Sequence, residues 1–311
     1  MKLTLPPVFL TRLDELIPEE KKHSVYDSFL HPRKTGIRIN TLKGSVDSVV
    51  NSLKKQNILL TPLDWFSNGF TFTGDKNILQ ETEEYKTGKV YFQSLSSMLV
   101  PVIYDPQHNE TILDMCASPG SKTTEIAALM ENTGKVVAND RSRERLFKLR
   151  ENIKTLGVIN TDVINLPGEM LWRRFPEVFD RVLVDVPCSM EGRFISGVEK
   201  TYKDWSPKKS KLLSQMQKKL LRSAVSCTKP GGTIIYSTCT LSIEENEAVI
   251  NWILKKEPTI TVEKIDIDIP ERMSGLTKYQ DKVFNPQLID TVRILPSERM
   301  EGFFIAKLRK A

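Results

Sequence analysis

The chain has 311 residues, of which 40% are hydrophobic and 27% charged, with a formal net charge of +6. This length allows a sizeable core, in one large domain or two modest ones, and the basic charge suits a polyanionic partner such as nucleic acid. The four cysteines lie far apart, which excludes a secreted disulfide scaffold and a paired-cysteine metal site, so no metal is expected. Because no apolar run approaches the roughly 20 residues of a membrane span, we expect a cytoplasmic protein without membrane contact.

The first hundred residues have the pattern of a small α/β lobe. Apolar side chains at helical spacing predict amphipathic helices over Leu10–Ile17 and Val46–Leu53, and strands are predicted at 36–40 and 69–72. The polar segment 80–88 is expected to be a loop. We place a domain boundary near residue 105.

Arg38 and Asn40 share one face of the predicted 36–40 strand, because side chains alternate along a strand. One interpretation is that this face is functional. The other is that it is an ordinary polar face in contact with solvent, and the pattern favours neither.

The pattern of the stretch 111–130 predicts a strand, a tight turn and a helix. An apolar run at 111–115 is followed by Pro119-Gly120 and then by apolar residues at helical spacing. A glycine at such a turn lets the backbone approach a ligand closely, and the free amides of the helix start can donate hydrogen bonds to it. The next predicted strand ends at Asp140, where a carboxylate is placed to accept hydrogen bonds from ribose hydroxyls. These features indicate a nucleoside-binding core.

From residue 111 onward the chain alternates strands with helices. Helices are predicted at 146–156, 212–224 and 248–253, strands at 182–184 and 233–236, and a turn at 229–232. This alternation predicts an α/β fold with a doubly wound, mostly parallel sheet and helices on both faces. In such sheets, ligands bind at the carboxyl ends of the strands.

Two cysteines lie on different turns at that edge of the predicted sheet, Cys188 after one strand and Cys239 after another. Such turns expose a thiol to a substrate while a protected pocket can tune its pKa. Cys227 falls in a helical apolar pattern and is interpreted as packing, and Cys116 as a structural residue of the nucleoside-binding turn.

These residues resemble the motif series of the RNA cytosine-5 methyltransferases, the Sun family, and in particular its bacterial small-subunit ribosomal RNA branch. The resemblance spans nearly the whole chain. The family resemblance rests on Arg38–Lys43, Gln93–Met98, Asp114–Thr123, Asp185–Ser189, Lys229–Gly232, Tyr236–Thr240, Glu244–Glu247 and Glu301–Lys307. The resemblance to the ribosomal branch rests on Pro7–Leu13 and Leu60–Trp65. It implies a Rossmann-like methyltransferase fold, with an N-terminal α/β RNA-binding lobe at 1–105 and a catalytic domain at 106–311.

By this resemblance, S-adenosyl-L-methionine is the methyl donor and carbon 5 of a cytosine in RNA is the acceptor. Carbon 5 is a poor nucleophile until a thiolate adds to carbon 6, and the resemblance gives that role to Cys239. Cys188 assists release of the product. Asp185 is placed to hydrogen-bond the cytosine ring, and Lys122 either lowers a thiol pKa or orients a polar group, if it is not simply a surface lysine.

The family's cofactor contacts transfer to a defined set of residues. They are Cys116, Ala117, Ser118, Pro119, Gly120, Ser121, Lys122, Asp140, Arg145, Gly168 and Asp185. One departure stands at the adenine end, where the family usually has Asp and this chain has Pro167, which offers neither a side-chain acceptor nor an amide donor. Either Glu169 replaces it, a backbone carbonyl meets the adenine amino group, or the cofactor binds weakly.

RNA contacts are indicated by nine Lys or Arg against two acids between 193 and 222, with Phe194, Tyr202 and Trp205 interspersed. Basic side chains neutralise phosphates and aromatic rings stack on unpaired bases, although the lysines also fit the solvated face of a helix packed through Leu212, Met216 and Leu220. The target cytosine must be unpaired or flipped out.

Ribosomal RNA is the first expected substrate and transfer RNA the second. The ribosomal branch commonly carries a further RNA-binding domain, whereas this chain ends soon after 302–307. A catalytically silent ribosome-assembly factor and a DNA methyltransferase are the alternatives from other classes. The first would not need the site residues, and the second would use Cys188 as its nucleophile. The pattern gives no oligomeric state, and a monomer is compatible with it.

Overall fold

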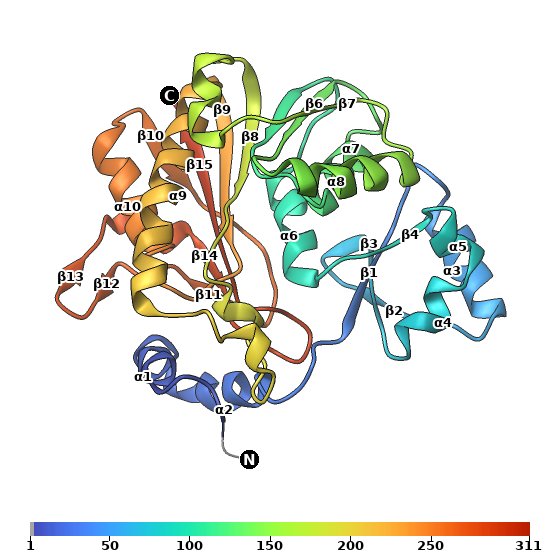
Figure 1. Ribbon diagram of the computed structural model, residues 1–311, viewed down its shortest axis with the longest axis horizontal. Helices are drawn as coiled ribbons and strands as arrows, with labels where there is room; N and C mark the ends of the chain where they lie inside the picture. Colours follow the sequence, from blue (N-terminus) through green and yellow to red (C-terminus); the bar gives the residue numbers. More distant parts are fainter. Residues whose placement is uncertain (1–2) are drawn as a thin grey trace.

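A nine-stranded sheet forms the centre of the larger part of the molecule, which the computed structural model describes over residues 3–311 (Figure 1). Five neighbouring strands are parallel, in the order β9-β8-β5-β6-β7. They are β5 (Thr111–Asp114), β6 (Lys135–Asn139), β7 (Thr161–Ile164), β8 (Phe179–Asp185) and β9 (Thr228–Thr238). The chain runs outward from β5 to β7 and then returns to the other side of β5. This reversal opens a crevice at the carboxyl ends of β5 and β8.

The remaining strands of this sheet are antiparallel, with β15 paired to β9 and also to β10 and β14. They are β10 (Ile260–Glu263), β11 (Arg272–Ser274), β14 (Val292–Ile294) and β15 (Phe303–Lys310), and a separate hairpin is formed by β12 (Lys278–Tyr279) and β13 (Lys282–Val283). β9 begins earlier than expected, because the predicted turn at 229–232 is a register shift within the strand opposite 179–181. The parallel part and its crossovers confirm the predicted fold class.

Helices cover both faces of the main sheet because its strands are apolar on both sides. Val182 and Val184 pack in the core cluster of α9 and α10, whereas Leu183 faces the opposite cluster with α6 and α7. The helices are α6 (Leu95–Tyr104), α7 (Ser121–Leu129), α8 (Arg143–Thr155), α9 (Pro207–Cys227) and α10 (Glu247–Lys256), with short 3-10 turns at Gly168–Arg173, Glu191–Arg193, Glu199–Thr201 and Pro286–Asp290. Cys227 is fully buried in this packing, as expected, but Leu212 is 63% exposed and does not join the core.

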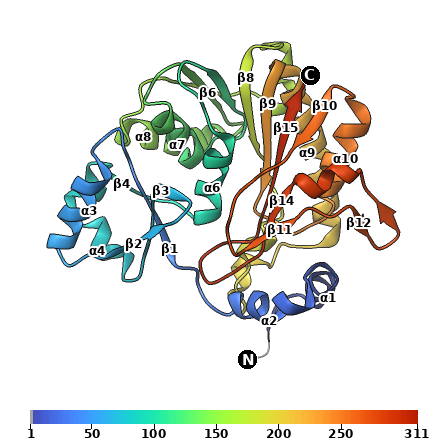
Figure 2. The ribbon, with the colours of Figure 1, turned by 180° about the vertical axis from the view of Figure 1, so that it is seen from behind.

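A second, four-stranded antiparallel sheet forms the small lobe to one side of the main sheet (Figures 1 and 2). Its strands lie in the order β2-β3-β1-β4. They are β1 (Thr35–Ile39), β2 (Leu60–Leu63), β3 (Phe66–Phe72) and β4 (Val90–Phe92), and α3 (Val46–Lys55), α4 (Lys76–Gln80) and α5 (Glu83–Lys86) belong to the same lobe. The predicted loop at 80–88 is wrong in part, since α5 lies within it and Thr82 caps that helix by accepting from the Tyr85 amide.

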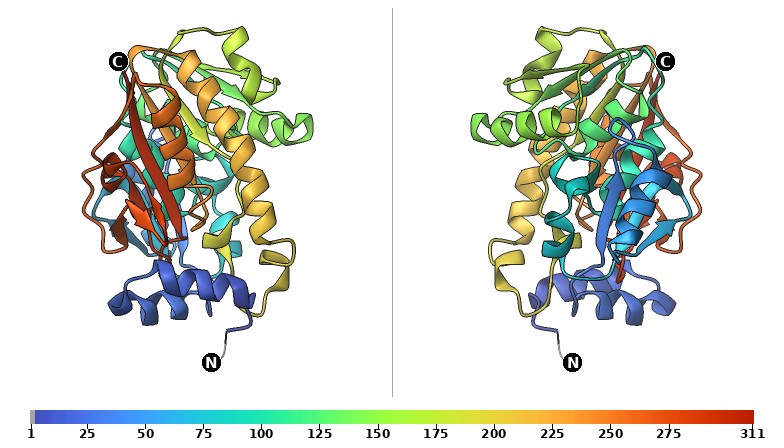
Figure 3. Two further views of the ribbon diagram at one scale, coloured as in Figure 1. Left: turned by 90° about the vertical axis from the view of Figure 1, so that its left-hand side faces the viewer. Right: turned by 90° about the vertical axis from the view of Figure 1, so that its right-hand side faces the viewer.

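The first two helices, α1 (Pro7–Leu16) and α2 (Glu19–Ser28), pack against the main sheet's part of the molecule rather than on the small sheet (Figure 3). Phe9 of α1 meets Phe194 with ring centroids 4.9 Å apart and Trp205 at 5.8 Å. Phe194 is completely buried. The prediction that this residue stacks on RNA is therefore wrong, because its ring anchors α1. The division at residue 105 stays a proposal.

Arg38 and Asn40 are buried where the small sheet meets α7, so neither belongs to a solvated face. Arg38 donates from Nε to Gln93 Oε1 (3.0 Å) and from Nη2 to Thr124 Oγ1 (2.9 Å). Asn40 donates to the carbonyl oxygens of Gly88 (2.9 Å) and Leu156 (2.8 Å). These bonds join the two parts of the molecule and satisfy buried polar groups.

Stability is expected to depend on pH through Glu125, a carboxyl buried beside Arg38 and Gln93. Burial raises the pKa of Glu125 to about 8 from an ordinary value of 4.5. Folding then takes up a proton between these values, so stability falls as pH rises through this window. In urea titrations from pH 6 to 8.5, we expect the wild type to lose about 2 kcal/mol relative to Glu125→Gln. Equal pH dependence of the two proteins would contradict this account.

Within residues 3–311, no helix combines the length and the apolar character needed to cross a membrane.

Candidate active site

The ends of β5, β8 and β9 bring four predicted residues to one cavity of about 520 Å³. Lys122 reaches it from the first turn of α7, Asp185 from the end of β8, and Cys188 and Cys239 from the two following turns. Gly120, at φ +104°, makes the tight entry to α7 that aims Lys122 inward. A Cβ there would lie 2.7 Å from Leu149 Cδ1.

The two cysteines form a close pair, with Cys188 Sγ 3.3 Å from Cys239 Sγ. A hydrogen bond from Cys188 lowers the pKa of Cys239, and the positive charge of Arg193 lowers it further. The same hydrogen bond, together with burial, raises the pKa of Cys188 well above its usual range. Cys239 is therefore the thiol of the pair that ionises first, which makes it the better candidate nucleophile.

Arg193 is the functional residue that the sequence reasoning missed, since it entered only as one of nine basic residues. It lines the cavity, and its guanidinium Nε donates to Glu301 Oε2 at 3.0 Å. Its position depends on Gly192, where a Cβ would lie 1.9 Å from the Gly302 carbonyl oxygen, and whose amide donates to the Cys239 carbonyl (3.1 Å). The contact between Gly192 and Gly302 joins segments 110 residues apart, so no local sequence pattern predicts it.

Lys122 is buried and forms an ion pair with Asp185, with Nζ 2.7 Å from Oδ2. It also donates to Ser97 Oγ at 2.9 Å, while Ser237 Oγ donates to the other oxygen of Asp185 at 2.8 Å. The interpretation of Lys122 as a surface lysine is wrong. Of its two functional interpretations, the contacts favour orienting a polar group, because Lys122 and Ser237 together fix the Asp185 carboxylate.

A second cavity of about 380 Å³ adjoins the first, and both are lined by Cys116, Arg145 and Pro187. Asp140 forms part of its wall, where its carboxylate accepts from the amides of Ser118 (3.1 Å) and Ser142 (2.9 Å) and faces Arg145 (3.4 Å). The other lining residues are Met115, Asn139, Arg141, Ser142, Gly168, Glu169, Met216 and Leu220.

Most of the predicted cofactor residues line one of these two cavities. Cys116, Asp140, Arg145 and Gly168 line the second, and Ser118, Pro119, Ser121, Lys122 and Asp185 line the first. Ala117 and Gly120 line neither, because Ala117 packs with Leu146 and Leu149, and Gly120 lies against Leu149. Both residues instead support the turn by packing against α8.

The residues fit a nucleoside cofactor, whose base has apolar faces and whose ribose is polar. The second cavity is lined by apolar Met115, Met216 and Leu220 and by polar Asp140 and Glu169. The buried Ser118 hydroxyl oxygen has no hydrogen-bond partner within the described chain, which leaves it available to a ligand. Pro167 is exposed and absent from the lining, whereas Glu169 lines the cavity with one oxygen 3.4 Å from Arg141 Nη1.

Comparisons with known proteins agree with this architecture. A family model described as 16S rRNA methyltransferase RsmB/F matches residues 101–309, and the model of the N-terminal domain of 16S rRNA methyltransferase RsmF matches residues 5–95. The chain belongs to the RsmB/F family. This confirms the Sun-family resemblance.

Among curated relatives of this RsmB/F-family chain, ribosomal RNA small subunit methyltransferase F of Salmonella arizonae and that of Salmonella agona are each 37% identical over 316 residues. The match covers 98% of this chain but 63% of each relative, so the chain spans less than two thirds of their length. Among solved structures, a methyltransferase homolog protein from Pyrococcus horikoshii superimposes with a TM-score of 0.83 at 30% identity, covering 99% of this chain and all of that one. NSun6 from Pyrococcus horikoshii, solved with SFG, has the same TM-score at 25% identity and 98% coverage of both chains. These likenesses confirm the methyltransferase fold.

In this family member, the motif Glu244–Glu247 holds the two cysteine turns together. Glu245 accepts from the Ser189 amide (3.0 Å), and Asn246 accepts from Thr238 Oγ1 (2.6 Å) while donating to the Thr240 carbonyl (2.9 Å). Each turn also contributes to a direct hydroxyl pair, Ser189 with Thr240, at 2.8 Å. The motif therefore supports the separation of the two thiols without entering the cavity.

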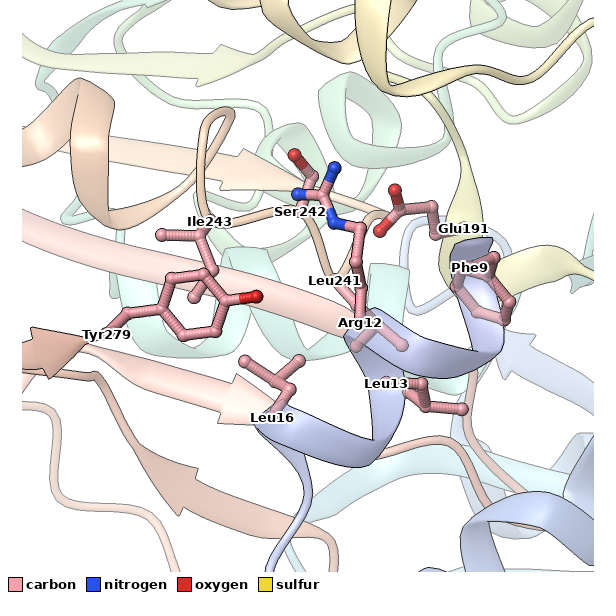
Figure 4. A pocket seen from close by; sticks show the side chains of 9 residues that line it. All are labelled: Phe9, Arg12, Leu13, Leu16, Glu191, Leu241, Ser242, Ile243 and Tyr279. Atoms are coloured by element: carbon pink, nitrogen blue, oxygen red, sulfur yellow. The ribbon is translucent and has the colours of Figure 1, made fainter. Parts of the chain in front are cut away.

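A small pocket between α1 and the Leu241–Ile243 segment lies behind this region (Figure 4). Arg12 of α1 points between Ser242 and Glu191, and it forms an ion pair with Glu244. Burial raises the pKa of Glu191 to about 7. The pocket has a volume of about 10 Å³, room for about one water molecule. It is part of the interface through which α1 packs against the active-site turns.

Proposed function

We propose that this protein transfers a methyl group from S-adenosyl-L-methionine to carbon 5 of a cytosine in small-subunit ribosomal RNA. The observation that carries the proposal is the close pair of thiols, Cys188 and Cys239, which lie 3.3 Å apart in a cavity that adjoins the one lined by Asp140 and Glu169. The names of the curated relatives support the ribosomal substrate.

The cofactor would occupy the second cavity. Asp140 would accept the ribose hydroxyls, and Cys116, Ser118 and Arg145 would border the opening toward the first cavity. When bound there, S-adenosyl-L-methionine supplies an activated methyl group. Glu169 lines this cavity and would accept from the adenine amino group, in place of the aspartate that the family usually has at Pro167.

Glu169→Ala is expected to weaken S-adenosyl-L-methionine binding about tenfold, because a hydrogen bond to a charged group contributes roughly 1.5–3 kcal/mol when desolvated and less near solvent. Isothermal titration calorimetry measures this directly. The matched control is Glu151→Ala, which removes an exposed glutamate of α8 that does not line the cavity. Unchanged affinity of Glu169→Ala would leave a backbone carbonyl as the partner of the adenine.

At the RNA side, the Cys239 thiolate forms a bond from Sγ to carbon 6 of the cytosine, which makes carbon 5 nucleophilic. Asp185, held by Lys122 and Ser237, is placed to hydrogen-bond the ring of the adduct. After carbon 5 carries the methyl group, its proton leaves to water and the bond between Sγ and carbon 6 breaks. Cys188 donates a hydrogen bond to the departing Cys239 sulfur, which stabilises it as a thiolate.

Nucleoside mass spectrometry tests the proposal. Ribosomal and transfer RNA from cells without the protein are each incubated with it and with S-adenosyl-L-methionine, and 5-methylcytosine is mapped. We expect one new modified position in the small-subunit RNA. Modification of transfer RNA would keep the reaction and overturn the substrate, and no product in either RNA or their ribosomal particles would favour an assembly factor.

A further inference from the structure

A third cavity, of about 370 Å³, continues from the active-site cavity along the junction of the two sheets. Both cavities are lined by Phe92, Gln93, Ser94, Arg193 and Glu301. The remaining walls come from the segment 32–36, from Lys76 of α4, and from Ile195 and Arg299. The chain before β15 meets the start of β1 here, with the Lys34 amide donating to the Glu298 carbonyl at 2.9 Å (Figure 2). We call this cavity the basic groove.

Five cationic side chains line the basic groove, against a single carboxylate of its own, Glu301. The cations are Arg33, Lys34, Lys76, Arg193 and Arg299. Three are matched by acids, Lys34 with Glu298 at 2.8 Å, Arg193 with Glu301, and Arg299 with Glu271 at 3.7 Å. The groove therefore keeps a net positive charge even when these neighbouring acids are counted.

Of these five cations, Arg33 and Lys76 have no carboxylate within 4.0 Å among residues 3–311. Arg33 is held in place by donating from Nη1 to the Phe194 carbonyl (3.0 Å), while its buried Nε and Nη2 have no partner in the described chain. Lys76 Nζ lies 6.0 Å from the centre of the Phe92 ring. Buried guanidinium donors without partners are costly, and because Arg33 lines the groove, the charge of an anion bound there would offset part of that cost.

We propose that the basic groove binds backbone phosphates of the RNA strand next to the target cytosine. This rests on the proposed function, because a cytosine at Cys239 requires its strand to leave the active-site cavity, and the basic groove is continuous with that cavity. Phe92 offers a ring at the point where the two cavities meet, where a neighbouring base can stack. Of the nine basic residues in the stretch 193–222, only Arg193 lines this groove.

The test is the binding of a fluorescein-labelled 12-nucleotide single-stranded RNA, measured by anisotropy over a range of salt. The variant Lys34→Gln/Lys76→Gln removes two exposed cations from the groove. We expect RNA affinity to fall about tenfold near 0.1 M salt, and the salt slope to decrease by about 1.4, because each lost contact with a single strand contributes roughly 0.7. The matched control is Lys278→Gln/Lys282→Gln, on the exposed β12–β13 hairpin far from the groove (Figure 1).

The control should bind RNA as the wild type does, and both variants should keep wild-type affinity for S-adenosyl-L-methionine. Equal RNA affinity of the two double variants would overturn the proposal and leave methyl transfer untouched. The proposal would also be overturned, in favour of an acidic protein partner, if polyglutamate bound with the affinity of RNA and lost the same affinity in Lys34→Gln/Lys76→Gln. Failure of methyl transfer with normal RNA binding would instead contradict the proposed function.

Discussion

Replacing Cys239 by alanine is expected to abolish methyl transfer, with a loss of more than about 1,000-fold, as is typical when a covalent nucleophile is removed. The reason is chemical: without the bond from Sγ to carbon 6, carbon 5 does not become nucleophilic. The lowered pKa of Cys239, caused by the hydrogen bond from Cys188 and by Arg193, makes it the thiol prepared for this role. Transfer of a radiolabelled methyl group to small-subunit RNA measures the loss.

Two controls separate this chemistry from damage to the fold. Cys239→Ala should keep wild-type affinity for S-adenosyl-L-methionine, because Cys239 lines the active-site cavity and not the second cavity. Cys227→Ala, which changes a buried cysteine at the end of α9, should remain active. Near-normal turnover of Cys239→Ala would show that the nucleophile is misassigned.

Replacing Cys188 by alanine is expected to leave protein covalently attached to RNA. The thiol of Cys188 lies 3.3 Å from Cys239 Sγ, so its removal takes away the hydrogen bond that stabilises the departing thiolate. Bond formation at carbon 6 continues while bond breaking slows, and the adduct accumulates. A denaturing gel shows it as a slower band that disappears on nuclease treatment.

The double variant Cys188→Ala/Cys239→Ala provides the matched control, because it should form no slow band. Loss of turnover in Cys188→Ala without any band would mean that Cys188 acts before the covalent step.

The strand ends could be predicted from the sequence because parallel strands have a simple rule. Apolar runs locate β5, β8 and β9, and whatever follows their carboxyl ends must meet at one edge of the sheet. This placed Asp185, Cys188 and Cys239 together before their distances were known. The structure adds what this rule does not give: the two sulfur atoms are hydrogen-bonded at 3.3 Å, and this bond together with the charge of Arg193 lowers the pKa of Cys239.

Residues positioned by contacts between distant segments could not be predicted in this way. Arg193 lines the same cavity as Cys239 because Gly192 packs on Gly302, and Phe194 is buried because α1 closes over it. In the sequence, Arg38 and Asn40 have the pattern of polar strand residues. In the structure, Arg38 donates to Thr124 on α7, and Asn40 donates to the carbonyl oxygens of Gly88, just before β4, and Leu156, at the end of α8. In each case the partner lies far away in sequence, so local pattern and composition carry no signal for it.

The measurement that tests the account most directly is the identity of the cysteine attached to RNA. Cys188→Ala is incubated with S-adenosyl-L-methionine and small-subunit RNA, the adduct is digested with nuclease and protease, and the modified peptide is sequenced by mass spectrometry. We expect a methylated cytidine nucleotide on Cys239. A nucleotide attached to any other residue, or an adduct found in Cys239→Ala through Cys188, would contradict it.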